Sequence, residues 1–131
     1  MLAFLFVTGL IFCAVGLYGL SNPVAAVGTP LGLLIDTTAG LNQMRACAGG
    51  VPLLIGLLQL SSLRWPTLAI PALWAVTVTL GGLILGRCLS LLVDGMPPTV
   101  NLVYMGLETF GFVQALYWLR VEARLDEAAA Q

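Results

Sequence analysis

Histidine and lysine are both absent from this chain of 131 residues, and only 8% of its residues carry a charge. Soluble domains typically contain about 25% charged residues, so the composition excludes an ordinary soluble domain. Disorder is excluded as well, because 60% of the residues are apolar and the net charge is only -1. With five arginines and no lysine, the chain lacks the basic surface that nucleic-acid binders use to hold phosphates. Nucleic acid is therefore not expected as a partner.

Motifs of catalysis and cofactor binding are missing too. Without histidine the chain has no ordinary ligand set for a transition metal, a haem or an iron-sulfur cluster. The three cysteines, Cys13, Cys47 and Cys88, form no C-x-x-C pair and fall outside the polar helix faces described below. Phosphate-binding glycine loops and nucleophile elbows are not found. The sequence predicts no metal and no resident cofactor, and it favours a protein that is not an enzyme.

Long apolar runs dominate what remains. A bilayer core of about 30 Å needs roughly 20 mostly apolar residues in a helix. Four stretches meet this requirement, at about residues 1–21, 41–62, 67–93 and 99–121, and a charged, helical tail follows over residues 122–131. The first stretch has no basic n-region and no convincing cleavage site, so we interpret it as a retained helix rather than a secretory signal. The sequence thus predicts an all-α fold, a bundle of four transmembrane helices forming a single membrane domain over residues 1–131.

The loop between the first two spans is unusual for its apolar content. Residues 22–40 include Val24, Val27, Leu33, Leu34 and Ile35, which are too apolar to hang freely in water. We expect this segment to lie at the membrane interface or to cap the bundle, with a short helix.

Orientation follows from the arginines, because basic loops stay on the cytoplasmic side of a membrane. With four spans, both termini share one side with the loop that follows the second span. That side carries Arg64, Arg120 and Arg124, whereas the loops of the opposite side carry Asp36 and Asp94 and no basic residue. We therefore expect both termini in the cytoplasm.

Three charged residues fall inside predicted spans, where charge is costly and normally faces a partner or a cavity. They are Arg45, Arg87 and Glu108, and counting about 1.5 Å per residue places all three in the outer half of the bilayer. Asp94 closes the third span on the same side, and Asn42 shares a helix face with Arg45. Residues spaced by three, four or seven positions lie on one face, so the polar faces of spans two to four are expected to point inward together.

Three interpretations of this polar cluster remain open. In the first, the charges form an internal clamp that fixes the register of the helices, since buried polar groups must be paired. In the second, they line a pocket open to the outer leaflet, where the arginines hold an anionic or carbonyl-bearing ligand. In the third, Glu108 belongs to a proton pathway. Only Gln59 and Thr79 continue the polar track inward, so a transporter has weak support.

Small residues and one proline mark expected contacts between helices. Pro52 removes a backbone hydrogen bond inside the second span and frees the carbonyl group of Ala48, so a kink is expected there beside Gly49. Two interpretations remain open: the kink relieves crowding between packed helices, or the freed carbonyl contacts a ligand. Gly82 and Gly86 form a small-xxx-small pair in the third span, which indicates close helix contact within the chain or with a partner.

Three motifs carry a family resemblance. They are Asn42-x-x-Arg45-x-x-x-Gly49, Gly86-Arg87 followed by Asp94-Gly95, and Glu108 in the fourth span. With this pattern the chain resembles a family of small bacterial four-helix membrane proteins catalogued as a domain of unknown function, similar to the broader DoxX-like group. The resemblance covers the chain to about residue 120 and implies an inner-membrane bundle. It marks five positions: Asn42, Arg45, Arg87, Asp94 and Glu108.

Two main functional hypotheses follow. The first is an integral membrane protein that acts as an accessory or assembly subunit or as a small binding module, with membrane lipids and another membrane protein as partners. The second is a membrane-embedded protein that binds a quinone or a lipid head group through Arg45 and Arg87, with Glu108 as a proton donor or acceptor. The DoxX-like group includes proteins linked to quinone or thiol redox chemistry. A cavity beside these residues would favour the second hypothesis.

Overall fold

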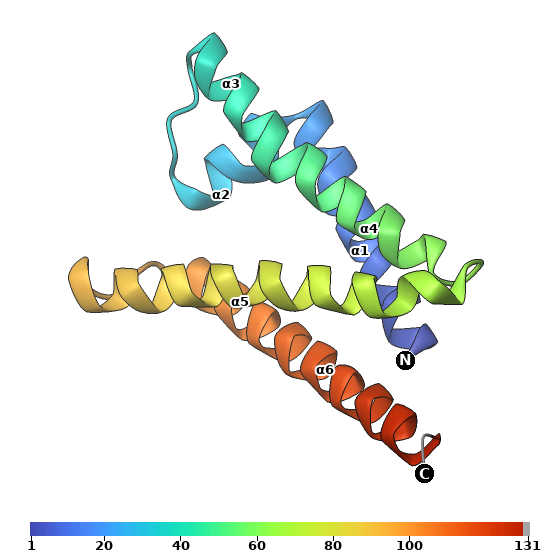
Figure 1. Ribbon diagram of the computed structural model, residues 1–131. Coiled ribbons are helices and arrows are strands. Elements are labelled where there is room, and N and C mark those ends of the chain that lie inside the picture. Colours follow the sequence, from blue (N-terminus) through green and yellow to red (C-terminus); the bar gives the residue numbers. More distant parts are fainter. Residues whose placement is uncertain (130–131) are drawn as a thin grey trace. The chain divides into compact units, whose positions relative to one another are not determined.

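The computed structural model describes residues 1–129, and every regular element among them is a helix (Figure 1). The all-α prediction is therefore confirmed for this part of the chain. The residues fall into two compact units, Leu2–Ala69 and a second that begins at Ile70. Three helices are long and apolar enough to cross a membrane, namely Leu2–Ser21, Thr38–Ser61 and Pro66–Val93. The fourth predicted span is helical but less apolar, so a bundle of four transmembrane helices stays a prediction.

The first unit is built on a pair of long helices. Helix α1 (Leu2–Ser21) packs along a helix that begins as α3 (Thr38–Met44), passes through the π-helical turn η2 (Arg45–Gly50) and continues as α4 (Val51–Ser61) (Figure 1). Thr37 caps the start of α3, because its side-chain oxygen accepts a hydrogen bond from the backbone N–H of Gly40 at 3.0 Å. This helix begins three residues before the predicted position, at Thr38 instead of Leu41.

The predicted apolar loop contains short helices. Residues Val24–Gly28 form the π-helical turn η1, and Thr29–Leu31 form α2. Gly32 ends α2 in the left-handed conformation, with φ of 67°, which a residue without a side chain adopts at little cost. The following residues carry no helix, and Leu34 is 87% exposed there. The short helix that was expected in this segment is present.

A wider helical turn lies just before Pro52. In η2 the hydrogen bonds reach one residue further than in an α-helix, and the backbone N–H of Val51 donates to the carbonyl of Ala46. Pro52 follows directly and has no N–H to give to Ala48. A π-helical turn is a known solution where the regular pattern is interrupted. The kink that the sequence predicts at Pro52 stays a prediction.

The second unit is a hairpin of two helices. Helix α5 (Ala69–Val93) follows the 3₁₀ turn η3 (Pro66–Leu68) and leads through a short turn into α6 (Thr99–Ala129). Gly95 lies in this turn with φ of 90°, where a side chain would be strained. Helix α6 continues unbroken to Ala129, so residues 122–129 of the predicted tail extend the last helix. Residues 130 and 131 of that tail lie outside the described residues.

Candidate functional site

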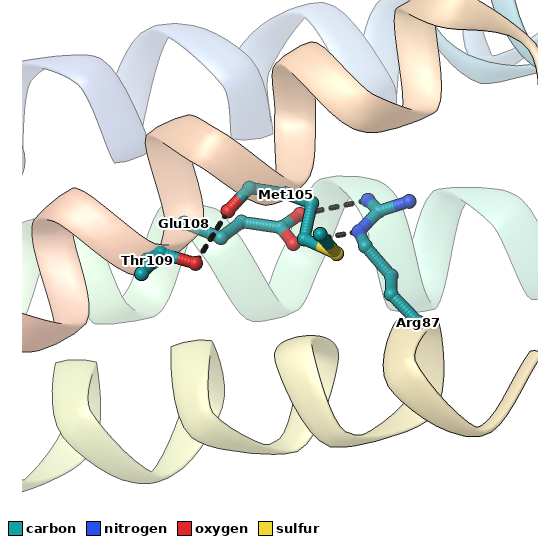
Figure 2. Close-up of polar contacts among 4 residues, drawn as sticks. All are labelled: Arg87, Met105, Glu108 and Thr109. Carbon is teal, nitrogen blue, oxygen red and sulfur yellow. Dashed lines mark hydrogen bonds and ion pairs between the residues drawn. The ribbon is translucent and has the colours of Figure 1, made fainter. Parts of the chain in front are cut away.

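A two-point ion pair joins the helices of the hairpin α5–α6. The Nε group of Arg87 donates to Oε2 of Glu108 at 2.6 Å, and Nη2 of Arg87 donates to Oε1 at 2.7 Å. Figure 2 shows the guanidinium reaching from α5 toward the carboxylate on α6. The side chains are 24% and 13% exposed, respectively. Such parallel bonds from a planar guanidinium to a carboxylate are both strong and directional.

An aromatic ring lies beside this pair, and the hydroxyl that follows Glu108 in the sequence bonds elsewhere. The Arg87 guanidinium lies 5.8 Å from the centre of the Tyr104 ring, within the range of a cation–π contact. The Thr109 hydroxyl, on the next position after Glu108, donates to the backbone carbonyl of Met105 at 2.7 Å (Figure 2). Both oxygens of the Glu108 carboxylate accept from Arg87, and the Thr109 hydroxyl bonds to neither of them.

A pocket of about 380 Å³ opens between α5 and α6 beside the ion pair. Its polar lining comes from Arg87, Ser90 and Asn101, and most of the rest is apolar. The complete lining is Gly82, Leu83, Gly86, Arg87, Ser90, Leu91, Pro97, Asn101, Leu102 and Met105. A mostly apolar cavity with a few convergent polar groups is the usual character of a small-molecule site.

Two of the predicted packing glycines border this pocket. A methyl group built on Gly82 or on Gly86 would meet no other atom within 4 Å. In the described residues neither glycine therefore serves a close helix contact. Their packing against another helix or a partner stays a prediction, while their lack of side chains contributes to the width of the pocket.

The predicted acidic residue at the end of α5 has a different partner from the one expected. The Ser90 hydroxyl donates to Oδ2 of Asp94 at 2.7 Å, and this pair is exposed. Among the ion pairs of residues 1–129, none includes Asp94. Asp94 thus lies about two helical turns after the pocket residue Arg87 and is not bound to it.

The other two predicted cluster residues lie in the unit Leu2–Ala69. Asn42 and Arg45 are both exposed there, and the Nε group of Arg45 donates to the carbonyl oxygen of Leu20 at 3.1 Å. Because the last carbonyls of a helix have no partner within it, Arg45 satisfies one of them at the end of α1. A single cluster that unites Asn42, Arg45, Arg87, Asp94 and Glu108 stays a prediction.

Gly49 lies in the contact between α1 and the helix Thr38–Ser61. A methyl group on Gly49 would lie 2.8 Å from the backbone nitrogen of Leu20. The carbonyl oxygen of Ala48, which Pro52 leaves without its usual donor, lies against Gly19 of α1. This contact favours packing over ligand binding as the role of that carbonyl.

One buried polar pair, Thr8 and Gln59, was not predicted from the sequence. The Thr8 hydroxyl of α1 donates a short hydrogen bond to Oε1 of Gln59 on α4, whose side chain is fully buried. The Nε2 group of Gln59 in turn donates to the carbonyl of Ile55 at 3.4 Å. The signal was present, because a buried amide in a membrane helix needs a partner and Thr8 is the one hydroxyl in the first half of the first span.

Residues 1–129 contain no assembled metal site and no paired cysteines. No three histidine, cysteine, aspartate or glutamate residues come together there as a metal site would require. The three cysteines are unpaired, and the Cys47 sulfur accepts a hydrogen bond from Gln43 at 2.9 Å.

Comparison with known protein families gives one match, to the model described as Domain of unknown function (DUF4345), over residues 1–119. Comparisons with curated proteins and with solved structures give no match. The predicted resemblance to a domain of unknown function is confirmed, whereas a bacterial origin and a likeness to the DoxX-like group stay predictions. Because the match covers most of the 131 residues, including every residue that lines the pocket, the chain belongs to the DUF4345 family.

Proposed function

We propose that this chain is an integral membrane protein that acts as a binding module without catalytic chemistry of its own. Its site is the pocket between α5 and α6. The observation that carries the proposal is a cavity of about 380 Å³ with an arginine and an asparagine in its wall, built on a hairpin whose first helix is long and apolar enough to cross a membrane. Pockets of this size and lining accommodate small organic ligands.

The apolar surface of the chain supports its place in a membrane. Helix α1 exposes large side chains such as Ile11 and Leu17 at 55% and 57%, and α5 exposes Leu85 and Leu92 at 72% and 84%. Soluble monomers rarely expose contiguous apolar patches of more than a few hundred Å². Lipid is the solvent that such helices need.

The topology we propose has four spans, with α6 as the fourth and both termini in the cytoplasm of a bacterium. Arg64, Arg120 and Arg124 would then share the cytoplasmic side. The apolar segment around Leu33 and Leu34 would lie at the opposite interface. Single cysteines placed at Trp65 and at Met96 in a cysteine-free background test this arrangement. A membrane-impermeant maleimide added to intact cells should label position 96 and not position 65, and the reverse result would contradict the topology.

Quinones and membrane lipids are the ligands we propose for the pocket. Both have a polar head for the arginine and asparagine, and both have an apolar part for the leucine side chains. The first experiment is gentle purification of the tagged protein from its native membrane, followed by mass spectrometry of small molecules that remain bound. We expect a quinone or a lipid in stoichiometric amount.

Two glycine variants provide a matched test of where that molecule binds. Gly86 and Gly106 both border open space, but only Gly86 lines the pocket. Gly86→Leu should fill the pocket and abolish retention of the molecule, whereas Gly106→Leu should retain it. Equal retention by both variants would overturn the pocket as the binding site.

A role as an accessory or assembly subunit is the second candidate, and the open small-residue face at Gly82 and Gly86 favours it. Small residues let the backbone of a neighbouring helix approach closely. The same purification decides between the candidates. One outcome is a membrane protein that co-purifies in stoichiometric amount, is lost with Gly86→Leu and is accompanied by no bound small molecule. This outcome would show that the chain is a subunit and not a binding module.

A further inference from the structure

We infer that the pocket between α5 and α6 selects an uncharged amphiphile whose head group accepts hydrogen bonds, as a carbonyl or ester oxygen does, and rejects anionic head groups. This inference rests on the proposed function and specifies its ligand class. The sequence leaves two ligand classes open at the arginines, an anion or a carbonyl-bearing molecule. The ion pair between Arg87 and Glu108 favours the second of these classes.

The charge around the pocket does not favour an anion. Arg87 is the only charged residue in the lining, and the Glu108 carboxylate neutralises it through two short hydrogen bonds. The lining residue Ser90 is itself bonded to the Asp94 carboxylate, which adds negative charge close by. An anionic head group would therefore enter a site whose single cation is already paired, and an uncompensated charge out of water is costly.

The hydrogen-bonding capacity of the pocket points to an acceptor. A guanidinium has five N–H donors and no acceptor, and Glu108 binds only Nε and Nη2 of Arg87. Among the hydrogen bonds of residues 1–129, none uses Nη1 of Arg87 or the side-chain amide of Asn101, the second polar group of the lining. Both groups line the pocket, so we infer that a neutral oxygen bound there accepts from one or the other and leaves the ion pair undisturbed.

The remaining lining fits the apolar part of such a molecule. Leu83, Leu91, Leu102 and Met105 provide hydrocarbon surface around the polar groups. A volume of about 380 Å³ is at the lower end of ligand pockets. It suits a head group and the first part of a chain, so the rest of the chain would extend between the helices into lipid.

Photolabelling with two probes that differ only in charge tests the inference. The probes are a diazirine-bearing fatty acid and its methyl ester, used with the full chain in lipid nanodiscs at about pH 9, where the free acid is ionised. Mass spectrometry locates the label. We expect the ester to label the segment from Leu91 to Met105 about tenfold more than the acid, with labelling abolished by Gly86→Leu and unchanged by Gly106→Leu.

The variant Glu108→Gln gives the most decisive photolabelling test, because it removes the neutralising charge and keeps the shape of the side chain. Arg87 then carries an unpaired positive charge, and a charge-assisted bond to a carboxylate is roughly twice as strong as a neutral one. We expect the preference to invert, so that the acid labels the pocket more than the ester does. If this variant does not fold, Asn101→Leu should lower ester labelling several-fold while Asn42→Leu, outside the pocket, leaves it unchanged.

The possible failures separate this inference from the proposed function. Equal or stronger labelling of the pocket by the acid in the unmodified chain would overturn the preference for uncharged ligands and leave a binding pocket in place. Pocket labelling by neither probe, or labelling that Gly86→Leu does not reduce, would overturn the binding pocket itself and with it the inference.

Discussion

Helices α1 and α4 approach each other backbone to backbone, whereas helices α5 and α6 are joined through side chains. A methyl group added to Gly16, Gly19 or Gly56 would collide with main-chain atoms of the opposing helix. In the second pair the nearest neighbours are side chains, Phe112 opposite Gly81 and Leu80 opposite Gly111. The first contact brings main chains together at its glycines, and the second leaves a pocket beside an ion pair.

The difference shows that composition alone does not assign a role to a glycine or to a polar residue. Glycines of α1 and α4 allow tight packing, while Gly82 and Gly86 widen a pocket. The polar pair Thr8–Gln59 is enclosed by the tight contact, while Arg87 faces the open one. Mutations in the two helix pairs test this difference between them.

The largest effect is expected from Gly19→Ala. The added methyl group would collide with the Ala48 carbonyl, which is main chain and cannot rotate away. We expect a loss of about 3 kcal/mol in the free energy of unfolding, as in severe overpacking. Gly106→Ala is the control, since its methyl group enters open space. Unfolding in mixed detergent measures both, and equal stabilities would contradict a backbone contact at Gly19.

Glu108→Gln should have the next largest effect on stability. Removing one partner of a fully buried ion pair costs about 3 to 5 kcal/mol, and partial exposure of this pair reduces the expected cost to about 2 kcal/mol. Adding Arg87→Gln should restore part of the loss, because the unpaired charge is then gone. Thermal unfolding of the two single variants and the double variant gives the coupling energy. A coupling of zero would show that the pair does not contribute to stability.

Thr8→Val should cost about 1 kcal/mol, since it leaves the buried Oε1 of Gln59 without a donor. Interhelical hydrogen bonds in membrane proteins contribute less stabilising free energy, on average, than model peptides suggest. The effect on stability is therefore expected to be modest. The double variant Thr8→Val with Gln59→Leu should be close to the unmodified chain. If Thr8→Val alone is neutral, the polar pair is not needed within the tight contact.

Arg45→Gln is expected to have the smallest effect, below about 1 kcal/mol. Its bond to the Leu20 carbonyl is exposed at the end of α1, where water or a lipid head group can replace it. Ligand retention in the pocket is expected to stay unchanged as well. A loss of retention comparable with that of Arg87→Gln would show that Arg45 contributes to the site and would support the larger cluster.

Much of the helical framework could be predicted from the sequence. Apolar runs of the length of a bilayer located all four long helices to within a few residues, because Pro23, Pro66, Pro97 and Pro98 separate them. A kink at Pro52 was predicted as well, since a missing N–H leaves a carbonyl unpaired wherever it occurs. Helix α6 extends beyond the predicted end of the span because the charged residues after Leu119 are themselves good helix formers.

The candidate site was predicted only in part. Helical spacing placed Arg87, Ser90 and Asp94 on one face and Glu108 on another polar face, but it left open whether Glu108 would pair with Arg45 or with Arg87. The structure pairs Glu108 with Arg87 in the hairpin, and both lie beside the pocket. Periodicity gives the direction of a side chain around its own helix. It contains no information on the distance to the next helix.

The sequence by itself determined that the chain is helical, apolar and interrupted at its prolines, because these properties depend on local hydrogen bonding and on transfer from water. Only the tertiary structure decided which glycines pack and which border open space, and which arginine Glu108 neutralises. Those outcomes depend on how closely two helices approach each other, and that distance is set by all the side chains between them together.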